Sequence, residues 1–180
     1  MFVNFIVKPF LAIKESHSRW LSNQWSKYKV PLPAIKDHQE LIEWMNINFK
    51  YIADPLNGIY DTYTHPEIAW YCSKNNAWGT VTYDCDDYAC MAYAMLLKMP
   101  GYEPKIMNLI INPWKVNDYA YNHVVCYFTT PTGSHKVIDT HPFIHDIDAR
   151  NGVEKGVLDR FSNLYAKDYK YVVPVRYPFY

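Results

Sequence analysis

The chain has no excess charge of either sign. Its 180 residues include 18 lysines and arginines and 18 aspartates and glutamates, so the formal net charge at pH 7 is zero. A balanced chain of this kind gives no electrostatic reason to expect a polyanion as its main partner. We therefore expect no nucleic-acid partner.

Long hydrophobic runs are also missing. The apolar stretch of residues 1–13 is interrupted by Lys8 and Pro9, is too short to span a bilayer, and has no A-x-A-like cleavage site after it. We expect no stable membrane insertion, no signal peptide and a cytoplasmic location. Residues 1–35 are interpreted as an N-terminal arm that packs on the rest of the chain, with an interfacial anchor as the alternative.

The sequence contains no repeat, no low-complexity segment and no glycine–serine linker. Its length suits one domain of ordinary size, and its 49% hydrophobic and 17% aromatic content argues against disorder. The cysteines do not have the spacing of a disulfide scaffold, which favours a reducing compartment. They are Cys72, Cys85, Cys90 and Cys126. We predict a single domain, residues 1–180, with a catalytic core at residues 37–140.

Helix signals occupy the first part of the chain. Residues 13–28 predict a short helix that the VPLP segment at 30–33 must end, because proline lacks a backbone donor. Residues 37–52 carry apolar residues at three- and four-residue steps, with Asp37 as N-cap and Glu40 three residues later. This pattern predicts an amphipathic helix.

Two further helices are predicted before the middle of the chain. One is short and starts near Pro66 within a loop-rich stretch at 53–83. The other covers residues 84–99, which are rich in alanine, methionine and leucine, open with an aspartate and close at Pro100-Gly101.

The second half of the chain carries strand signals. Residues 105–111, 122–128, 135–140 and 169–175 are enriched in β-branched and aromatic residues, and a turn-forming TTPTGS segment joins the second run to the third. Helices followed by an antiparallel sheet define an α+β domain. Residues 141–180 are interpreted as a C-terminal extension that completes the sheet.

Cys85 stands at the start of the predicted helix at 84–99. The unpaired backbone N–H groups and the dipole of a helix N-terminus favour an anion and so lower the pKa of a thiol. A buried packing role is the common one for a free cysteine and suits Cys90 and Cys126 better, because Cys85 lies among Asp84, Asp86 and Asp87. Since these carboxylates oppose a thiolate, a nucleophilic Cys85 requires a cationic partner.

His123 begins one predicted strand and Asp139 ends the next. A hairpin register centred on residue 131 places the two directly opposite each other, with Cβ atoms roughly 5 Å apart. A carboxylate at that distance can orient an imidazole, and a Cys85–His123–Asp139 triad follows as a hypothesis. A structural histidine on a strand is the simpler alternative.

These residues resemble a known family. DCDDYA from Asp84, NHVV around His123 and VID ending at Asp139 are similar to the Cys, His and Asp blocks of the transglutaminase-like superfamily. The resemblance is to the bacterial transglutaminase-like cysteine proteinases, whose nucleophile block reads G-D-C-E-D-Y-A. NFKYIAD at 48–54 and DTYTHPEIAW at 61–70 resemble two further segments of that family.

The resemblance implies a papain/transglutaminase-like fold, with N-terminal helices and a nucleophile at a helix N-terminus packed on an antiparallel β-sheet. The backbone N–H of Cys85 then supplies one oxyanion donor. The glycine pair that usually precedes Asp-Cys is replaced by Thr82-Tyr83, and the second donor is unassigned. Tyr83, Trp78 and Asn76 are candidates by position, with packing or turn roles as the alternatives.

Metal binding is considered for two sets of residues. The resemblance implies a calcium site at Asp84 and Asp86, but a helix cap is the favoured alternative for these carboxylates. Zinc at a site of Cys72, Cys85, Cys90 and His123 is disfavoured, because their spacing forms no C-x-x-C knuckle. We expect no required cofactor. The set His135, His141, His145, Asp146 and Asp148 is interpreted as a solvated loop.

The resulting functional hypothesis is a cysteine-nucleophile hydrolase or acyltransferase that acts on an amide bond through a thioester. A protein or peptide is the expected substrate, and the family resemblance favours a peptidase, with amidase and transglutaminase activity left open. The alternative is a non-catalytic binding or assembly protein that retains the scaffold and uses its many tyrosines as an interaction surface.

Overall fold

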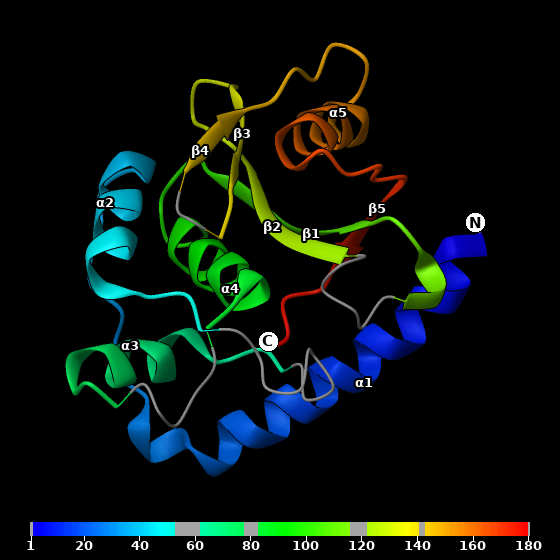
Figure 1. Cartoon of the computed structure of the whole chain (residues 1–180). Helices are drawn as coiled ribbons and strands as arrows, with labels where there is room; N and C mark the ends of the chain where they lie inside the picture. The colour runs from blue at the N-terminus through cyan, green and yellow to red at the C-terminus, as the bar shows by residue number, and fades with distance from the viewer. Residues whose placement is uncertain (1, 53–61, 78–82, 116–121, 141–142, 180) are drawn as a thin grey trace.

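The computed structural model of the chain describes residues 2–52, 62–77, 83–115, 122–140 and 143–179. In these residues the architecture is α+β, with five α-helices and one five-stranded antiparallel sheet (Figure 1). The strand order is β4-β3-β2-β1-β5. The α+β class predicted from the sequence is confirmed.

The N-terminal arm is a helix over most of its length. Helix α1, Phe2–Gln24, begins well before the predicted start at residue 13, so that boundary was wrong. Val7, Leu11 and Ser18 are buried along one side of α1, which shows that packing stabilises a helix across Pro9. A short 3₁₀ helix, η1, follows at Ser26–Tyr28.

Helices α2 and α3 form where local signals predict them. Helix α2, His38–Asn48, has Asp37 as its N-cap, whose carboxylate accepts from Gln39 N–H at 3.0 Å and from Glu40 N–H at 2.9 Å. It ends before the predicted boundary, because Ile52 forms a β-bridge with Tyr83. Helix α3, Pro66–Lys74, has its proline in the first turn.

Four predicted strands are present, namely β1 at Glu103–Ile110, β2 at Asn122–Thr129, β3 at His135–Ile138 and β5 at Tyr171–Val175. A 3₁₀ helix, η4, lies at Pro113–Lys115. Strand β4 at Ile144–Asp146 and helix α5 at Val153–Tyr165 were not predicted. The C-terminal segment thus supplies the strands at both edges of the sheet, with a helix between them in sequence.

The sheet separates two hydrophobic cores. Helix α4, Cys85–Leu96, packs on one face against residues that include Val124, Cys126 and Ile138. Helix α5 packs on the other face, where Val157 and Phe161 are fully buried. Figure 1 shows α4 and α5 on opposite sides of the strands. The sheet therefore lies between the helix that carries Cys85 and the helix that covers the opposite face.

Within the described residues, no helix combines the length and the hydropathy that a bilayer span requires.

Candidate active site

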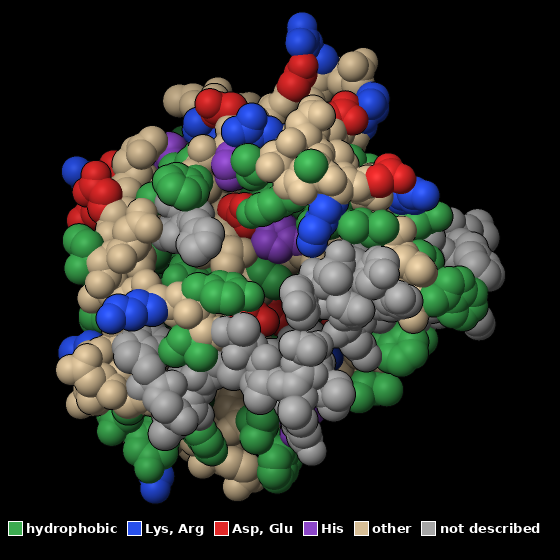
Figure 2. Space-filling model, in the orientation of Figure 1, with side chains coloured by type: hydrophobic (Ala, Val, Ile, Leu, Met, Phe, Trp, Pro, Cys, Tyr) green, Lys and Arg blue, Asp and Glu red, His purple; other side chains and the backbone are tan. Residues whose placement is uncertain are grey.

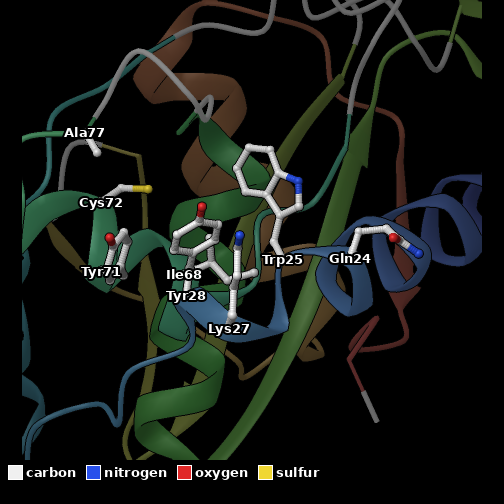
Figure 3. A pocket seen from close by; sticks show the side chains of 8 residues that line it. All are labelled: Gln24, Trp25, Lys27, Tyr28, Ile68, Tyr71, Cys72 and Ala77. Carbon is white, nitrogen blue, oxygen red and sulfur yellow. The ribbon is translucent and has the colours of Figure 1, made fainter.

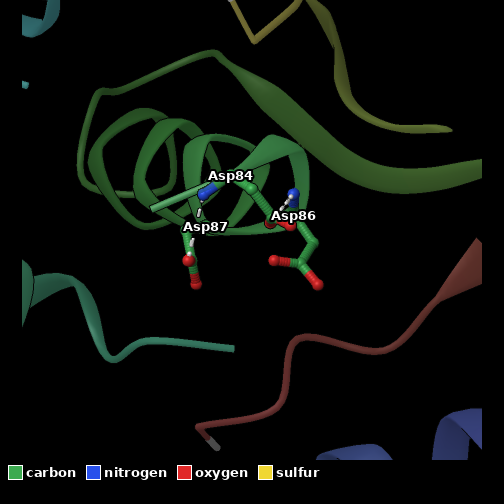
Figure 4. A group of neighbouring side chains, drawn as sticks. All are labelled: Asp84, Asp86 and Asp87. Atoms are coloured by element: carbon green, nitrogen blue, oxygen red, sulfur yellow. Dashed lines mark hydrogen bonds between the residues drawn. The ribbon is translucent and has the colours of Figure 1, made fainter. Parts of the chain in front are cut away.

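Cys85 is the first residue of α4. Asp84 is the N-cap, and a capping box closes the helix start, because the Asp87 carboxylate accepts from the Asp84 backbone N–H at 3.3 Å (Figure 4). The local sequence therefore explains why the helix begins here and why Cys85 lies at its first turn.

The surroundings of the Cys85 thiol favour a thiolate less than a helix N-terminus alone would. Burial raises the pKa of the Cys85 thiol well above its usual value, and the charges of Asp84 and Asp86 add to the effect. A hydrogen bond from the Val124 backbone N–H and the charge of Lys14 act in the opposite direction. The expectation of a lowered pKa is wrong for this structure, in which Cys85 is a neutral thiol at neutral pH.

Lys14 of α1 is a cation that the sequence did not identify. Its ammonium group forms an ion pair with the Asp86 carboxylate, and it also lies 4.3 Å from the centre of the Tyr63 ring. Asp86 is only 1% exposed, so the pair is buried beside the nucleophile candidate. Lys14 thereby offsets one of the two carboxylates that oppose a Cys85 thiolate.

His123 and Asp139 are in direct contact. Nε2 of His123 lies 2.5 Å from Oδ1 of Asp139. The predicted register was wrong by two residues, since Tyr127 pairs with Val137 and continuation of that ladder places Val125 opposite Asp139. A two-residue shift keeps both side chains on one face of the sheet, so His123 and Asp139 meet as diagonal neighbours.

The end of the β2–β3 ladder explains where the Cys85 thiol lies relative to β2. The last residue pair of the ladder is Cys126 and Ile138. At its other end the N–H of Thr130, which directly follows β2, donates to the Ser134 carbonyl oxygen. Alternate N–H groups of a strand point to the same side, so the Val124 N–H points to the β3 side of β2, as the Thr130 N–H does. Val124 lies beyond the last residue pair of the ladder, and its N–H there donates to the Cys85 thiol. The thiol therefore lies where β2 and β3 separate, beside the backbone of the residue that follows His123.

Asp139 is 3% exposed and receives hydrogen bonds from several groups. Besides His123, Oδ1 accepts from the Thr140 backbone N–H at 2.6 Å, and Oδ2 accepts from the Tyr165 hydroxyl. Burial alone raises the pKa of Asp139, but the hydrogen bond and charge of His123, together with the Tyr165 and Thr140 donors, lower it to about 2. Asp139 is an anion throughout the neutral range.

Two residues near Asp139, Tyr165 and Arg160, were not among the predicted site residues, and a third, His145, was predicted to lie in a solvated loop. Tyr165 and Arg160 belong to α5, and His145 belongs to β4. The solvated-loop interpretation of His145 was wrong, because it is 7% exposed and its Nδ1 lies 3.0 Å from the Arg160 guanidinium. His141, from the same predicted loop, lies outside the described residues. An apolar i, i+4, i+8 pattern in 153–165 was the available signal for α5.

The other members of that group also have partners. Asp146 pairs with Lys136 at 2.5 Å and Asp148 with Arg150 at 2.5 Å, whereas Nδ1 of His135 lies 2.6 Å from the Tyr127 hydroxyl. Figure 2 shows histidine side chains beside acidic ones in the middle of one face of the molecule.

The candidates for a second oxyanion donor have other roles where they are described. Tyr83 is fully buried and stacks on Phe49 with 4.7 Å between ring centres. Asn76 has a positive φ of 51° just after α3, as a turn residue does. Trp78 and Thr82 lie outside the described residues. The Asp84 side chain already accepts from the Asp86 and Asp87 N–H groups, so the Cys85 N–H is the one in this first turn that the cap does not bond.

The three carboxylates at the start of α4 lie within 4.8 Å of one another, and among the described residues they are the one group close enough to share a metal ion (Figure 4). Asp84 caps the helix, Asp87 accepts from Asp84 and Thr64, and Asp86 holds Lys14. Each carboxylate thus already has a partner within the protein, so these residues fit a cap and an ion pair better than calcium. The four residues considered for zinc do not form a comparable group.

A cavity of about 510 Å³ opens between the end of α1, η1 and α3 (Figure 3). Its walls include the rings of Trp25, Tyr28 and Tyr71, with 5.1 Å between the centres of the two tyrosine rings. Cys72, which is 2% exposed, lies at its inner side. None of Cys85, His123 and Asp139 lines this cavity.

Comparisons of the chain with protein-family models, with curated proteins and with solved structures found no match. Evidence for its function therefore comes from the geometry of the residues described above.

Proposed function

We propose that this protein is a cysteine-nucleophile hydrolase or acyltransferase of papain/transglutaminase-like fold that acts on an amide bond, with peptide hydrolysis as the reaction favoured by the family resemblance. Cys85 is the proposed nucleophile, His123 the base and Asp139 the residue that orients it. The observation that supports the proposal is the partly buried His123–Asp139 pair beside the backbone that contacts the Cys85 thiol.

The proposed reaction begins with a neutral thiol. Because Nε2 of His123 is bonded to Asp139, Nδ1 is the ring nitrogen that takes the thiol proton as the sulfur attacks the amide carbonyl. The imidazolium, supported by the Asp139 anion, returns the proton to the leaving amine, and a thioester forms. Water or a second amine then attacks the thioester, which releases an acid or a new amide and restores the thiol.

The second candidate function is a non-catalytic binding or assembly protein. The observation that favours it is an exposed apolar side of α1, on which Phe10, Ile13 and Trp20 are 48%, 70% and 56% exposed. Their spacing of three and seven residues places them on one side of the helix. Trp114 of η4, close to α1, is 71% exposed. Exposed aromatic groups of this size are typical of interaction surfaces.

Alkylation of Cys85 by iodoacetamide, followed by peptide mapping, tests the proposal in wild type and in His123→Ala. At about pH 7 the variant should react about 100-fold more slowly, because the neutral thiol loses its base. At about pH 10 the difference should shrink, because the higher hydroxide concentration raises the thiolate fraction in both proteins without the help of His123.

His17→Ala, on the exposed surface of α1, is the matched control and should leave both rates unchanged. The buried Cys90 and Cys126 serve as internal references in the same digest. Equal rates for Cys85 in wild type and His123→Ala at about pH 7 would contradict the triad and favour the binding protein.

A further inference from the structure

The C-terminal segment encloses the Asp139 carboxylate. Oδ1 faces His123 and the Thr140 N–H, whereas Oδ2 faces the Tyr165 hydroxyl of α5 and His145 of β4. Neither Tyr165 nor His145 lies in the part of the chain that resembles the transglutaminase-like family. This segment therefore contributes contacts that the resemblance does not account for.

Tyr165 touches both members of the proposed pair. Its hydroxyl donates to Oδ2 of Asp139, and its ring meets the His123 imidazole edge to face, with 5.2 Å between ring centres and 70° between planes. Phe161, one turn earlier on α5, lies 5.9 Å from the same imidazole. A single side chain thus constrains the orientation of the carboxylate and of the ring that it binds.

His145 is a competing partner for the same carboxylate. Its Nε2 is buried, has no hydrogen-bond partner among the described residues, and lies 3.9 Å from Oδ2 of Asp139, beyond hydrogen-bond range. Arg160 holds the other ring nitrogen at 3.0 Å, which keeps Nε2 directed at Asp139. A small rotation of the carboxylate would bond Oδ2 to His145 and draw Oδ1 away from His123.

We propose that Tyr165 is a positioning residue of this site, whose hydroxyl holds Oδ2 away from His145 so that Oδ1 stays on Nε2 of His123. The inference rests on the proposed function, because its consequence is a His123 imidazole kept in the orientation that accepts the Cys85 proton. The lowered pKa of Asp139, to which the Tyr165 hydroxyl contributes, is consistent with this contact.

Tyr165→Phe tests the proposal, since it keeps the ring and removes only the donor. We expect alkylation of Cys85 at about pH 7 to slow about tenfold, the usual consequence of losing one hydrogen bond to a charged group, with little change at about pH 10. Adding His145→Leu should restore most of the rate, because the competing partner is then gone. Tyr171→Phe is the matched control, because Tyr171 is 37% exposed and Tyr165 is 38% exposed. In this variant Cys85 should be alkylated at the wild-type rate.

The outcomes separate the two hypotheses. If His123→Ala is slow but Tyr165→Phe reacts like wild type, the positioning role is wrong and the proposed function stands. If wild type and His123→Ala react alike, the proposed function fails and the positioning role fails with it. A merely structural role would slow Tyr165→Phe equally at both pH values, without recovery in the double variant, and would also contradict the proposal.

A measurement on the unchanged protein covers the case in which Tyr165→Phe does not fold. Carboxyl-carbon NMR should show Asp139 titrating near a pKa of about 2 in wild type. A midpoint at the ordinary value of about 3.9 would show that the carboxylate is not enclosed by these donors and would overturn the inference.

Discussion

At the scale of single residues, Asp139 is the most informative group of the site. It is a buried carboxylate that stays ionised because His123, Thr140 and Tyr165 all donate to it. A buried charge without such partners would be protonated or would destabilise the fold. The same contacts that orient the imidazole therefore also contribute to stability, and that contribution depends on pH.

The pKa of Asp139 predicts the direction of this dependence. The folded value of about 2 lies below the unfolded value of about 3.9, so Asp139 contributes stability that is present above about pH 4 and lost as the pH falls through 2. The full contribution is about 2.6 kcal/mol, and roughly half is lost by pH 3. Urea unfolding at about pH 6 and at about pH 3 measures this. Between the two pH values the free energy of unfolding should fall by about 1 kcal/mol more in wild type than in Asp139→Asn.

Asp168→Asn is the control for this experiment, because the Asp168 side chain is 80% exposed, and it should keep the wild-type dependence on pH. If the free energy of unfolding falls equally in wild type and in Asp139→Asn, Asp139 has the same pKa in the folded and unfolded states.

At the scale of the elements, local signals were sufficient wherever a helix or strand carries its own start or stop. Asp37, Pro66 and Asp84 mark the beginnings of α2, α3 and α4 as the sequence predicted. Helix α5 has no such mark, since it follows Gly152 at φ 99° without a side-chain cap. Strand β4 has only three residues, and its pairing with β3 depends on tertiary contacts that no short pattern reports.

Helices α1 and α4 are joined by the Lys14–Asp86 ion pair, and this pair gives a prediction about stability. Lys14→Met should reduce the free energy of unfolding by about 3 kcal/mol, because Asp86 stays buried without its cation. The double variant Lys14→Met/Asp86→Leu should recover much of the loss. Chemical denaturation of the three proteins measures these changes.

The exposed pair of Lys155 and Asp159, 2.8 Å apart on α5, is a matched control. Lys155→Met should cost at most about 0.5 kcal/mol, since solvent screens a surface pair. Equal losses for Lys14→Met and Lys155→Met would contradict a buried pair between α1 and α4.

At the scale of the whole molecule, the sheet has a helical layer on each face, and the proposed site includes residues from both. Helix α4 provides the thiol and α5 provides Tyr165. Helix α5 approaches the rest of the chain closely at Gly156, where a Cβ atom would lie 2.2 Å from the Asp148 carbonyl oxygen and 2.9 Å from Ile147 Cγ2. A glycine is therefore required for this layer to pack as it does.

Gly156→Ala tests that requirement. Helix propensity alone predicts that the free energy of unfolding rises by about 1 kcal/mol. The contact with the Asp148 backbone predicts instead that it falls by about 2 kcal/mol, because α5 is pushed outward. Urea unfolding decides between the two signs. Glu154→Ala, at an exposed position on the same helix, should change stability by less than about 0.5 kcal/mol.

The sequence by itself determined the α+β class, the start of the helix at Cys85 and the hairpin that carries His123 and Asp139. Caps, turns and hydrophobic periodicity are properties of neighbouring residues, so they can be read without the fold. Tertiary structure decided the two-residue difference in register, the approach of Lys14 to Asp86, and the enclosure of Asp139 by Tyr165 and His145. These contacts join residues far apart in the chain, and packing on the two faces of the sheet, rather than any local pattern, brings them together.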